Sequence, residues 1–175
     1  MKRTIRQIRV ESKIVFVPLT KGYESVIDAA DVTLVAGFNW TAKVRRRADG
    51  AVLCVYAYRR ICVGRKSQTV FMHRAIAGTP DGLQTDHIDG NGLNNSRSNL
   101  RIATSTENSC NRQKTSNNKS GFKGVYFDKA KEKWLAQIML LGKTRRLGGY
   151  ANIEDAAAAY AKASAELHGE FGRIA

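Results

Sequence analysis

The sequence has few cysteines, and their arrangement would hold neither a disulfide framework nor a zinc ion. Cys54, Cys62 and Cys110 are odd in number, and none of them forms a C-x-x-C pair. An odd number of cysteines does not support a disulfide framework, and the lack of a C-x-x-C pair does not support a four-thiolate zinc site. We therefore expect reduced cysteines and no structural zinc.

Long apolar runs are also missing. No segment approaches the roughly 18 apolar residues that a membrane span needs. The basic residues 1–13 are not followed by the apolar stretch and small-residue cleavage site of a secretory signal. The apolar content of 43% is nevertheless that of a folded protein. We expect a cytoplasmic protein without a membrane partner.

Acidic residues are scarce beside basic ones, with 15 Asp and Glu against 29 Lys and Arg and a net charge of +14. Basic residues outnumber acidic ones 14 to 5 in residues 1–70 and 12 to 6 in residues 109–175, but only 3 to 4 in residues 71–108. Basic flanks bind phosphate backbones through counterion release, which favours a nucleic-acid partner. A solvated cationic surface would also explain the charge, but not the near-neutral centre.

Residues 1–70 predict a β-rich segment that leads into the centre. Strands are expected where β-branched and aromatic residues gather, at residues 13–19, 40–47, 51–59 and 68–72. Asp49-Gly50 predicts a hairpin turn. Short helices are expected at residues 25–35 and 73–77, with a turn at residues 79–82.

Residues 112–119 have the polar composition of a linker, and residues 120–175 predict a small second domain. Strands are expected at residues 124–127, 134–140 and 143–147, with a tight turn at Leu141-Gly142. Asn152 can cap a helix that runs to Leu167 and stops before Gly169. A three-stranded antiparallel sheet packed on one helix follows from this order.

The segment from Asp86 to Asn108 is dense in groups that bind metals or move protons. Phosphodiester hydrolysis needs a base for water and a hard divalent cation with oxygen ligands. His87 can be the base, and Asp86 is a hard oxygen ligand. Neighbouring side chains of a strand point to opposite faces, so both could flank one phosphate only if the backbone bends at or just after them. The glycines at 90 and 92 supply such a bend.

Three short motifs of this segment resemble the ββα-metal active site of the HNH endonuclease family, in its phage and intron homing branch: Asp86-His87, Asn99-Leu100-Arg101 and Glu107-Asn108. The resemblance covers roughly residues 71–111. It implies that His87 is the general base, that Asp86 and Asn108 bind the metal, and that Asn99 supports the loop behind the histidine. Asn108 stands where the motif often has histidine. Oxygen ligands suit Mg²⁺ or Mn²⁺ better than Zn²⁺.

Details of the segment remain open. The helix of the motif either runs from about Ser98 or Asn99 to Asn111 or begins at Thr104, where a capping pattern favours the second interpretation. Arg101 either clamps a phosphate or is solvated. His73 matches a recurrent His-Arg ahead of the motif, and a buried, hydrogen-bonded histidine is favoured over a phosphate contact.

Residues 120–175 resemble the Apetala/ethylene-response-factor DNA-binding domain, through Ser120–Phe127, Gly148–Tyr160 and His168–Phe171. That family lays a three-stranded sheet in the major groove, with the helix behind it. By position, the resemblance implies DNA contacts from Lys123, Tyr126, Lys133, Gln137, Arg145 and Arg146. Trp134 either packs in the sheet or contacts the groove wall. A basic solvated sheet face is the alternative.

We therefore expect an α+β protein in four parts: a basic β-rich segment (1–70), an HNH core (71–111), a linker (112–119) and an Apetala/ethylene-response-factor-like domain (120–175). Its predicted activity is metal-dependent nicking of double-stranded DNA by a monomer, in a bacterial cell or phage-infected host, with no obligate protein partner. The alternatives are a transcription regulator with an inactive nuclease motif and a structural RNA-binding protein. The full set of Asp86, His87, Asn99 and Asn108 favours the enzyme.

Overall fold

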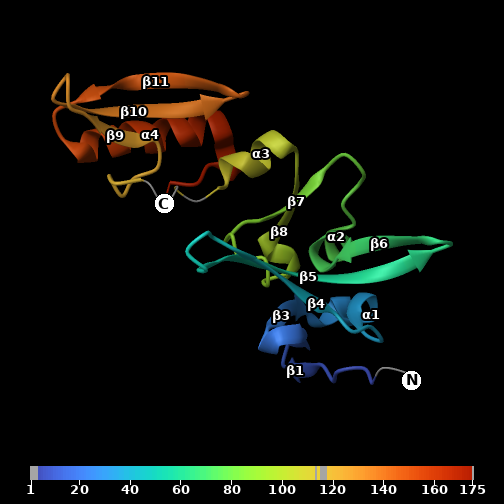
Figure 1. Ribbon diagram of the computed structural model, residues 1–175. Helices are drawn as coiled ribbons and strands as arrows, with labels where there is room; N and C mark the ends of the chain where they lie inside the picture. The colour runs from blue at the N-terminus through green and yellow to red at the C-terminus, as the bar shows by residue number, and fades with distance from the viewer. Residues whose placement is uncertain (1–3, 113, 115–117, 175) are drawn as a thin grey trace. The chain divides into compact units, whose positions relative to one another are not determined.

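The computed structural model describes residues 4–112, 114 and 118–174 (Figure 1). Within them the chain forms several small antiparallel sheets and few helices, so the predicted mixture of α and β structure is confirmed. Part of the predicted linker, residues 113 and 115–117, lies outside the described residues. None of the described helices has the length and apolar composition that crossing a membrane requires.

The chain divides into two compact units, Met1–Ile102 and Ala103–Ala175, each with a hydrophobic core of its own. This division differs from the predicted bounds, because Met72 and Ile76 share one core with the N-terminal strands. Packing units and sequence domains need not coincide. The four predicted domain ranges therefore stay a prediction.

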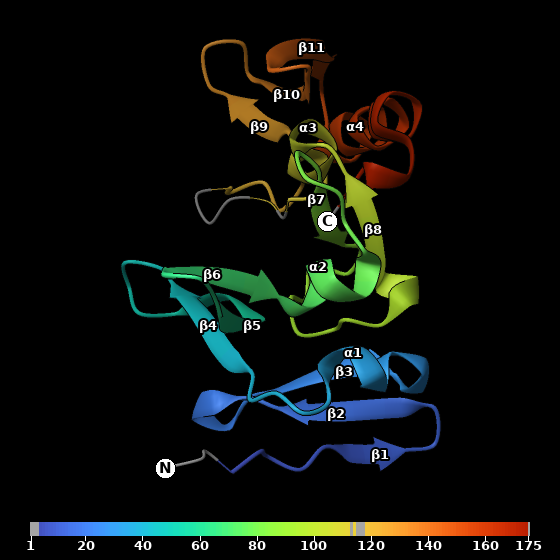
Figure 2. The ribbon, with the colours of Figure 1, turned by 90° about the vertical axis from the view of Figure 1, so that its right-hand side faces the viewer.

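The first sheet of the first unit is antiparallel, in the order β1-β2-β3 (Figure 2). Its elements are β1 (Arg9–Glu11), β2 (Ile14–Pro18), the 3₁₀ turn η1 (Thr20–Gly22) and β3 (Glu24–Asp28). Every second residue of β2 and β3 is buried, which is the pattern of a sheet with one face on a core. The strand predicted at residues 13–19 is confirmed. The sequence does not predict β1, whose three residues are all exposed.

The helix predicted at residues 25–35 is wrong over its first part. Strand β3 occupies residues 24–28, and the 3₁₀ turn η2 (Ala29–Asp31) and the one-turn helix α1 (Val32–Val35) follow it. Ser25 and Ile27 are buried at the two-residue spacing of a strand, which pairs with β2. The predicted helix depends on the helix propensity of Ala29 and Ala30. Strand pairing and burial determine the structure of the residues before them.

The second sheet has the order β4-β5-β6 and is also antiparallel. Its strands are β4 (Thr41–Arg46), β5 (Val52–Val63) and β6 (Lys66–Phe71), which confirms the three predicted strands with shifted ends. The predicted hairpin turn is present: Gly50 has a φ of 85°, and Asp49 Oδ1 accepts a hydrogen bond from the N–H of Ala51 at 2.9 Å. β5 continues past its predicted end at Arg59 and turns at Gly64.

The remaining elements of the first unit lie in the predicted nuclease segment. They are α2 (Met72–Ala77), β7 (Gln84–His87), the 3₁₀ turn η3 (Arg97–Asn99) and β8 (Leu100–Ala103). α2 confirms the predicted helix at residues 73–77, and Gly78 ends it with a left-handed φ of 60°. β7 and β8 form a two-stranded sheet. We call residues 88–99 the β7–β8 loop.

The second unit has the predicted sheet and helix. Its elements are α3 (Ser105–Cys110), β9 (Val125–Asp128), β10 (Lys133–Leu140), β11 (Lys143–Tyr150), α4 (Ile153–His168) and the 3₁₀ turn η4 (Gly169–Phe171). The antiparallel sheet has the order β11-β10-β9. Val125 and Ile138 of the sheet are buried together with Ala156 and Tyr160 of α4.

Both helix starts predicted in this part of the chain are correct. Thr104 and Glu107 form a capping box, in which each side chain accepts a hydrogen bond from the other residue's N–H. Of the two starts open for the helix of the motif, the one at Thr104 is therefore right. Asn152 Oδ1 likewise accepts from the N–H of Asp155 at 2.8 Å at the start of α4.

Replacing Gly124 should test how closely α4 packs on the sheet. A Cβ at Gly124 would lie 2.4 Å from Gln137 O and 2.4 Å from the Tyr160 ring, on a backbone with φ of +72°. Gly121 has a similar φ of +80° but open space around it. We expect Gly124→Ala to lower the free energy of unfolding by about 1–3 kcal/mol more than Gly121→Ala. Urea unfolding followed by circular dichroism measures this, and equal losses would contradict the packing described.

Candidate nuclease site

Strand β7 places Asp86 and His87 at the start of a tight turn. Both side chains are buried, each residue being 5% exposed. The chain turns directly after His87: Gly90 has a φ of 76°, and its N–H donates to His87 O at 2.8 Å. The bend that the sequence analysis requires after the Asp-His pair is therefore present.

The imidazole of His87 is held by an asparagine that the sequence analysis did not single out. His87 Nε2 lies 2.9 Å from Asn95 Oδ1. Asn95 is fully buried, and its Nδ2 donates to Ser25 Oγ at 2.7 Å. Burial lowers the pKa of His87, against the opposing effects of Asn95 and of the carboxylates of Asp89 and Asp86. A lowered pKa keeps the ring neutral near pH 7, the form that can accept a proton.

Asn99 holds the β7–β8 loop through both its side chain and its backbone. Its Oδ1 accepts from the N–H of Asp89 at 3.0 Å, and its Nδ2 donates to Asp89 Oδ1 at 2.9 Å and to Asn94 O at 2.8 Å. Its carbonyl accepts from the N–H of Ile88 at 2.9 Å. A residue that supports the loop behind His87 would make bonds of this kind. That role for Asn99 remains a prediction.

Asp89 is the centre of this loop. Its carboxylate accepts hydrogen bonds from the N–H of Asn91 at 2.7 Å and from Asn94 Nδ2 at 2.8 Å, besides the bond from Asn99. Burial raises the pKa of Asp89, but these hydrogen bonds outweigh it and lower the pKa overall. The ionised carboxylate therefore organises the turn behind His87.

Gly92 lets the loop lie directly against β5. A Cβ at this position would lie 2.4 Å from Val55 O and 2.5 Å from Tyr56 Cδ1. Only a residue without a side chain fits this approach, which is the usual reason for glycine at such a contact. The sequence predicts a turn at Gly92 but gives no sign of this close approach to β5.

Arg101 forms an ion pair with Asp86. The sequence predicts either a phosphate clamp or a solvated side chain for Arg101, and neither includes this pair. Its Nε and Nη2 both donate to Asp86 Oδ2, at 2.8 Å and 2.7 Å. The two side chains are only 11% and 6% exposed, so this ion pair is shielded from solvent. Arg101 is thus not a solvated residue, and its use as a phosphate clamp stays a prediction.

His73 lies among rings beside His87. The ring centroids of His73 and His87 are 5.0 Å apart, and Phe71 stacks on His73 with centroids 5.3 Å apart. His73 is buried as predicted, but its Nδ1 makes no hydrogen bond within the described part of the chain. Burial, and then the charges of His87 and Arg74, lower the pKa of His73 to about 3. It is therefore a neutral ring at physiological pH.

The oxygen donors at this site suit a hard divalent cation that takes only a few of its ligands from the protein. Across the described residues, no three His, Cys, Asp or Glu side chains are grouped as a metal site. Mg²⁺ is often bound through one or two carboxylates, with waters and substrate phosphates completing its shell. The buried Asp86 carboxylate fits that mode.

Asn108, the second predicted ligand, lies on α3 in the other unit. Its N–H donates to Thr104 O at 3.0 Å, as expected in the first turns of a helix. Since β7 and β8 pair in one unit and α3 counts with the other, the ββα arrangement and the role of Asn108 stay predictions.

The sheet of the second unit separates the predicted DNA-binding residues by face. Gln137 pairs with Arg146, and Ile138 pairs with Arg145. Directly paired residues share a face, and Ile138 is buried under α4. Arg146 therefore lies on the face away from α4, and Arg145 on the face toward it.

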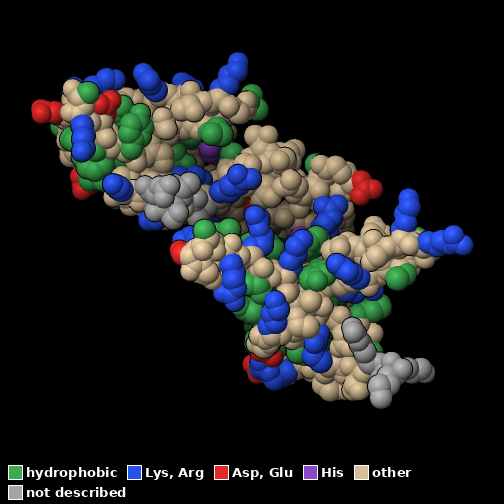
Figure 3. All heavy atoms as spheres, in the orientation of Figure 1, with side chains coloured by type: hydrophobic (Ala, Val, Ile, Leu, Met, Phe, Trp, Pro, Cys, Tyr) green, Lys and Arg blue, Asp and Glu red, His purple; other side chains and the backbone are tan. Residues whose placement is uncertain are grey.

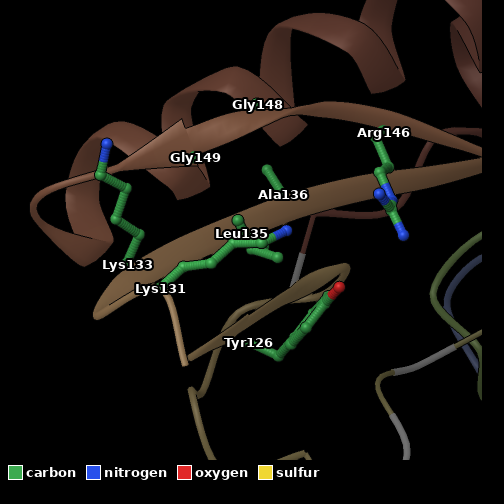
Figure 4. Close-up of a pocket in the computed structure, with 8 residues that line it drawn as sticks. All are labelled: Tyr126, Lys131, Lys133, Leu135, Ala136, Arg146, Gly148 and Gly149. Carbon is green, nitrogen blue, oxygen red and sulfur yellow. The ribbon is translucent and has the colours of Figure 1, made fainter. Parts of the chain in front are cut away.

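A shallow cavity of about 290 Å³ lies on the open face of this sheet (Figure 4). Tyr126, Lys131, Lys133 and Arg146 border it, and Gly148 and Gly149 leave space above the strands. Gln137 shares this face through its pairing with Arg146. Trp134 packs with its ring centroid 5.1 Å from that of Phe127, at the edge of the core, which answers the open question about it in favour of packing.

Lys123 is placed differently from the other predicted contacts. Its Nζ donates to Cys110 O at 2.5 Å, at the end of α3. Burial lowers the pKa of Lys123, against the opposing effect of Cys110. A DNA contact by Lys123 would have to replace this bond, and it stays a prediction.

Comparisons with known proteins identify the segment that carries this geometry. A family model described as HNH endonuclease matches residues 72–110. Protein 3.8 of Escherichia phage T7 is 39% identical over 95 residues, which cover 54% of this chain and 78% of the phage protein. Residues 72–110 therefore form an HNH endonuclease domain. An uncharacterized HNH endonuclease, L560 of Acanthamoeba polyphaga mimivirus, is 38% identical over 92 residues, which cover 53% of this chain and 46% of that protein. No solved structure matches.

The predicted family of the central segment is thus confirmed, whereas the Apetala/ethylene-response-factor resemblance of residues 120–175 stays a prediction. The HNH segment also depends on residues that sequence reasoning missed: Ser25, Asp89 and Asn95. Asp89 carried a signal, because an Asp-Gly-Asn run forms side-chain-bonded turns. Ser25 carried none, since it lies far from the segment in sequence and was assigned to a helix.

The buried ring of His73 should make the first unit sensitive to acid. A histidine with a pKa near 6.5 when unfolded and about 3 when folded stabilises the fold above pH 6.5, and this contribution is lost as the pH falls toward 3. The loss approaches about 1.4 kcal/mol per pH unit. His73→Phe should flatten this decline. Urea unfolding in a Trp134→Phe background, where Trp40 alone reports on the first unit, measures it; equal pH dependence with and without His73 would contradict the assignment.

Proposed function

We propose that the chain is a metal-dependent DNA endonuclease in which His87 is the general base. The observation that carries the proposal is the buried Asp86-His87 pair at the end of β7, within the segment that matches the HNH family. In this proposal Asp86 and Asn108 bind a divalent cation, Mg²⁺ or Mn²⁺, and Asn99 holds the loop that carries the base.

The contacts of His87 support its role as a base. Its ring is neutral near pH 7, is oriented by Asn95 and lies directly before a turn held by Asp89 and Asn99. His87 would take a proton from the water that attacks the phosphorus atom. A bound divalent cation would stabilise the charge that develops on the phosphate and the leaving oxygen.

One observation favours a second candidate function, a DNA-binding regulator with an inactive motif. Arg101 donates twice to Asp86 Oδ2, and a guanidinium beside a carboxylate competes with a cation for its charge. In the endonuclease proposal, the same arginine orients Asp86 and offers positive charge to the phosphate. Metal-dependent cleavage separates the two functions.

The basic surface supports DNA as the substrate. Between residues 41 and 71, which hold β4, β5 and β6, there are eight Lys and Arg and one acidic residue. Figure 3 shows Lys and Arg side chains spread over this part of the first unit, with few acidic ones among them. Such a surface binds a phosphate backbone without regard to sequence. We propose that these strands and the open face of the second unit's sheet hold the DNA.

A single site of this kind cuts one strand, so we propose that the monomer nicks DNA. No obligate protein partner is part of the proposal, and its setting is the cytoplasm of a bacterial cell or a phage-infected host. The similarity to a protein of Escherichia phage T7 supports the phage-infected host.

Removing the base should abolish nicking. With supercoiled plasmid and Mg²⁺ or Mn²⁺, we expect wild-type protein to give nicked circles and His87→Ala to be slower by about 100-fold or more, the contribution of a general base. His168→Ala is the matched control, because His168 Nε2 bonds Met139 O in the other unit. The DNA-binding regulator would be favoured if wild-type protein gave no nicked product with either metal. It would also be favoured if EDTA did not suppress the product. Equal rates for His87→Ala and wild type would refute the base.

The face assignment of the second unit gives a paired test of DNA binding. Arg146→Ala should weaken binding to duplex DNA and reduce the slope of log K against log salt concentration by about 0.9, the value for one lost phosphate contact. Arg145→Ala removes the same charge from the face toward α4 and should have the smaller effect. Fluorescence anisotropy over a series of salt concentrations measures both. Equal effects would mean that the open face is not the DNA-binding face.

A further inference from the structure

A chain of buried polar groups connects strand β3 with the imidazole of His87. Ser25 and Asn95 are both 0% exposed, although their side chains are polar. Asn95 Nδ2 donates to Ser25 Oγ at 2.7 Å, and Asn95 Oδ1 lies 2.9 Å from His87 Nε2. Buried polar groups at such distances must pair donor with acceptor, so each contact restricts the next.

The direction of this chain is set at its far end. The hydroxyl of Ser25 donates to Leu93 O at 3.0 Å and lies 3.3 Å from Met72 Sδ. A carbonyl oxygen and a thioether sulfur can only accept, so the hydroxyl hydrogen points to one of them and not to Asn95. Ser25 Oγ can therefore only accept from Asn95, which turns the amide so that its Nδ2 faces Ser25 and its Oδ1 faces His87.

We propose that Ser25 and Asn95 are positioning residues that fix the tautomer of His87. Asn95 Oδ1 accepts only, so His87 Nε2 carries the hydrogen and Nδ1 is the nitrogen that takes a proton from water. This inference rests on the proposed function, in which His87 is the general base. It adds which groups select the tautomer of that base: two buried side chains, one of them on strand β3.

The backbone holds the chain of groups in place from both sides. The N–H of Val26 donates to Leu93 O at 2.8 Å, and Val26 O accepts from the N–H of Asn95 at 2.8 Å. Ser25 and Asn95 therefore cannot separate without breaking the pairing of β3 with the β7–β8 loop. Ser25 lies outside residues 72–110, so the positioning groups extend beyond the segment that matches the HNH family.

Nitrogen NMR of the full chain tests the proposal directly. In ¹⁵N-histidine-labelled wild type above pH 7, His87 should show a protonated Nε2 and an unprotonated Nδ1, with no averaging between tautomers; His87→Ala assigns its signals. A protonated Nδ1, or shifts averaged between the two forms, would overturn the proposal. This measurement needs no activity, so it stays separate from the test of nicking.

The Ser25→Ala variant tests the selection. Without the hydroxyl, the amide of Asn95 is free to turn, and we expect averaged His87 shifts with a fall in the kcat of nicking of about 10- to 100-fold, as found for groups that orient catalytic ligands. KM for plasmid should not change, because Ser25 is 0% exposed and cannot touch a bound substrate. Unchanged shifts and an unchanged kcat would overturn the proposal.

Two further variants keep the test decisive. Ser96→Ala is the matched control, because the Ser96 hydroxyl lies in the same loop but makes no capping hydrogen bond to η3. We expect this variant to keep the His87 nitrogen shifts and the kcat of wild type. Asn95→Asp serves if Ser25→Ala does not fold. A carboxylate at this position offers only acceptors to His87 Nε2, so the neutral ring should keep its hydrogen on Nε2. A switch of Asn95→Asp to the Nδ1 tautomer would overturn the proposal.

Discussion

The pairing of strand β3 with the β7–β8 loop is the interaction on which the candidate site depends. Two backbone hydrogen bonds, to and from Val26, hold the loop at residues 93–95. Arg97 adds bonds to Asp28 and Asp31, but its side chain is exposed, so solvent weakens that contribution. The buried backbone bonds cannot be exchanged for water without opening the core. They let a loop hold a fully buried polar side chain, Asn95, next to the histidine.

The loop itself is fixed by two other constraints of different kinds. One is electrostatic: the Asp89 carboxylate collects hydrogen bonds from Asn91, Asn94 and Asn99 and stays ionised. The other is steric, since Gly92 permits contact with Tyr56 that no larger residue allows. Together with β3, they determine the position of the His87 ring from three sides. In the proposed role as a base, a ring held in this way would lose little freedom when substrate binds, which is how preorganised sites lower a reaction barrier.

Local sequence patterns predicted the elements that neighbouring residues stabilise. They failed for elements that depend on contacts with distant parts of the chain. The capping box at Thr104, the cap at Asn152 and the Asp49-Gly50 turn follow from neighbouring residues and are present. The strand at Ser25 depends on pairing with β2 and with the β7–β8 loop, which no short window contains. For the site, the Asp-His pair and the bend after it could be read from the sequence. The partner of Asp86, Arg101, could not, because composition gives no information on which charges meet in a fold.

The two separate cores have a consequence for how such a protein changes over time. Each unit buries its own apolar side chains, around Trp40 in one and around Tyr160 in the other. A substitution in one core therefore leaves the packing of the buried side chains in the other unchanged. Selection can alter the exposed sheet of the second unit, for instance around Gly148 and Gly149, while the histidine and its partners stay intact. In the proposed endonuclease, target choice can therefore change without altering the hydrogen bonds that hold His87.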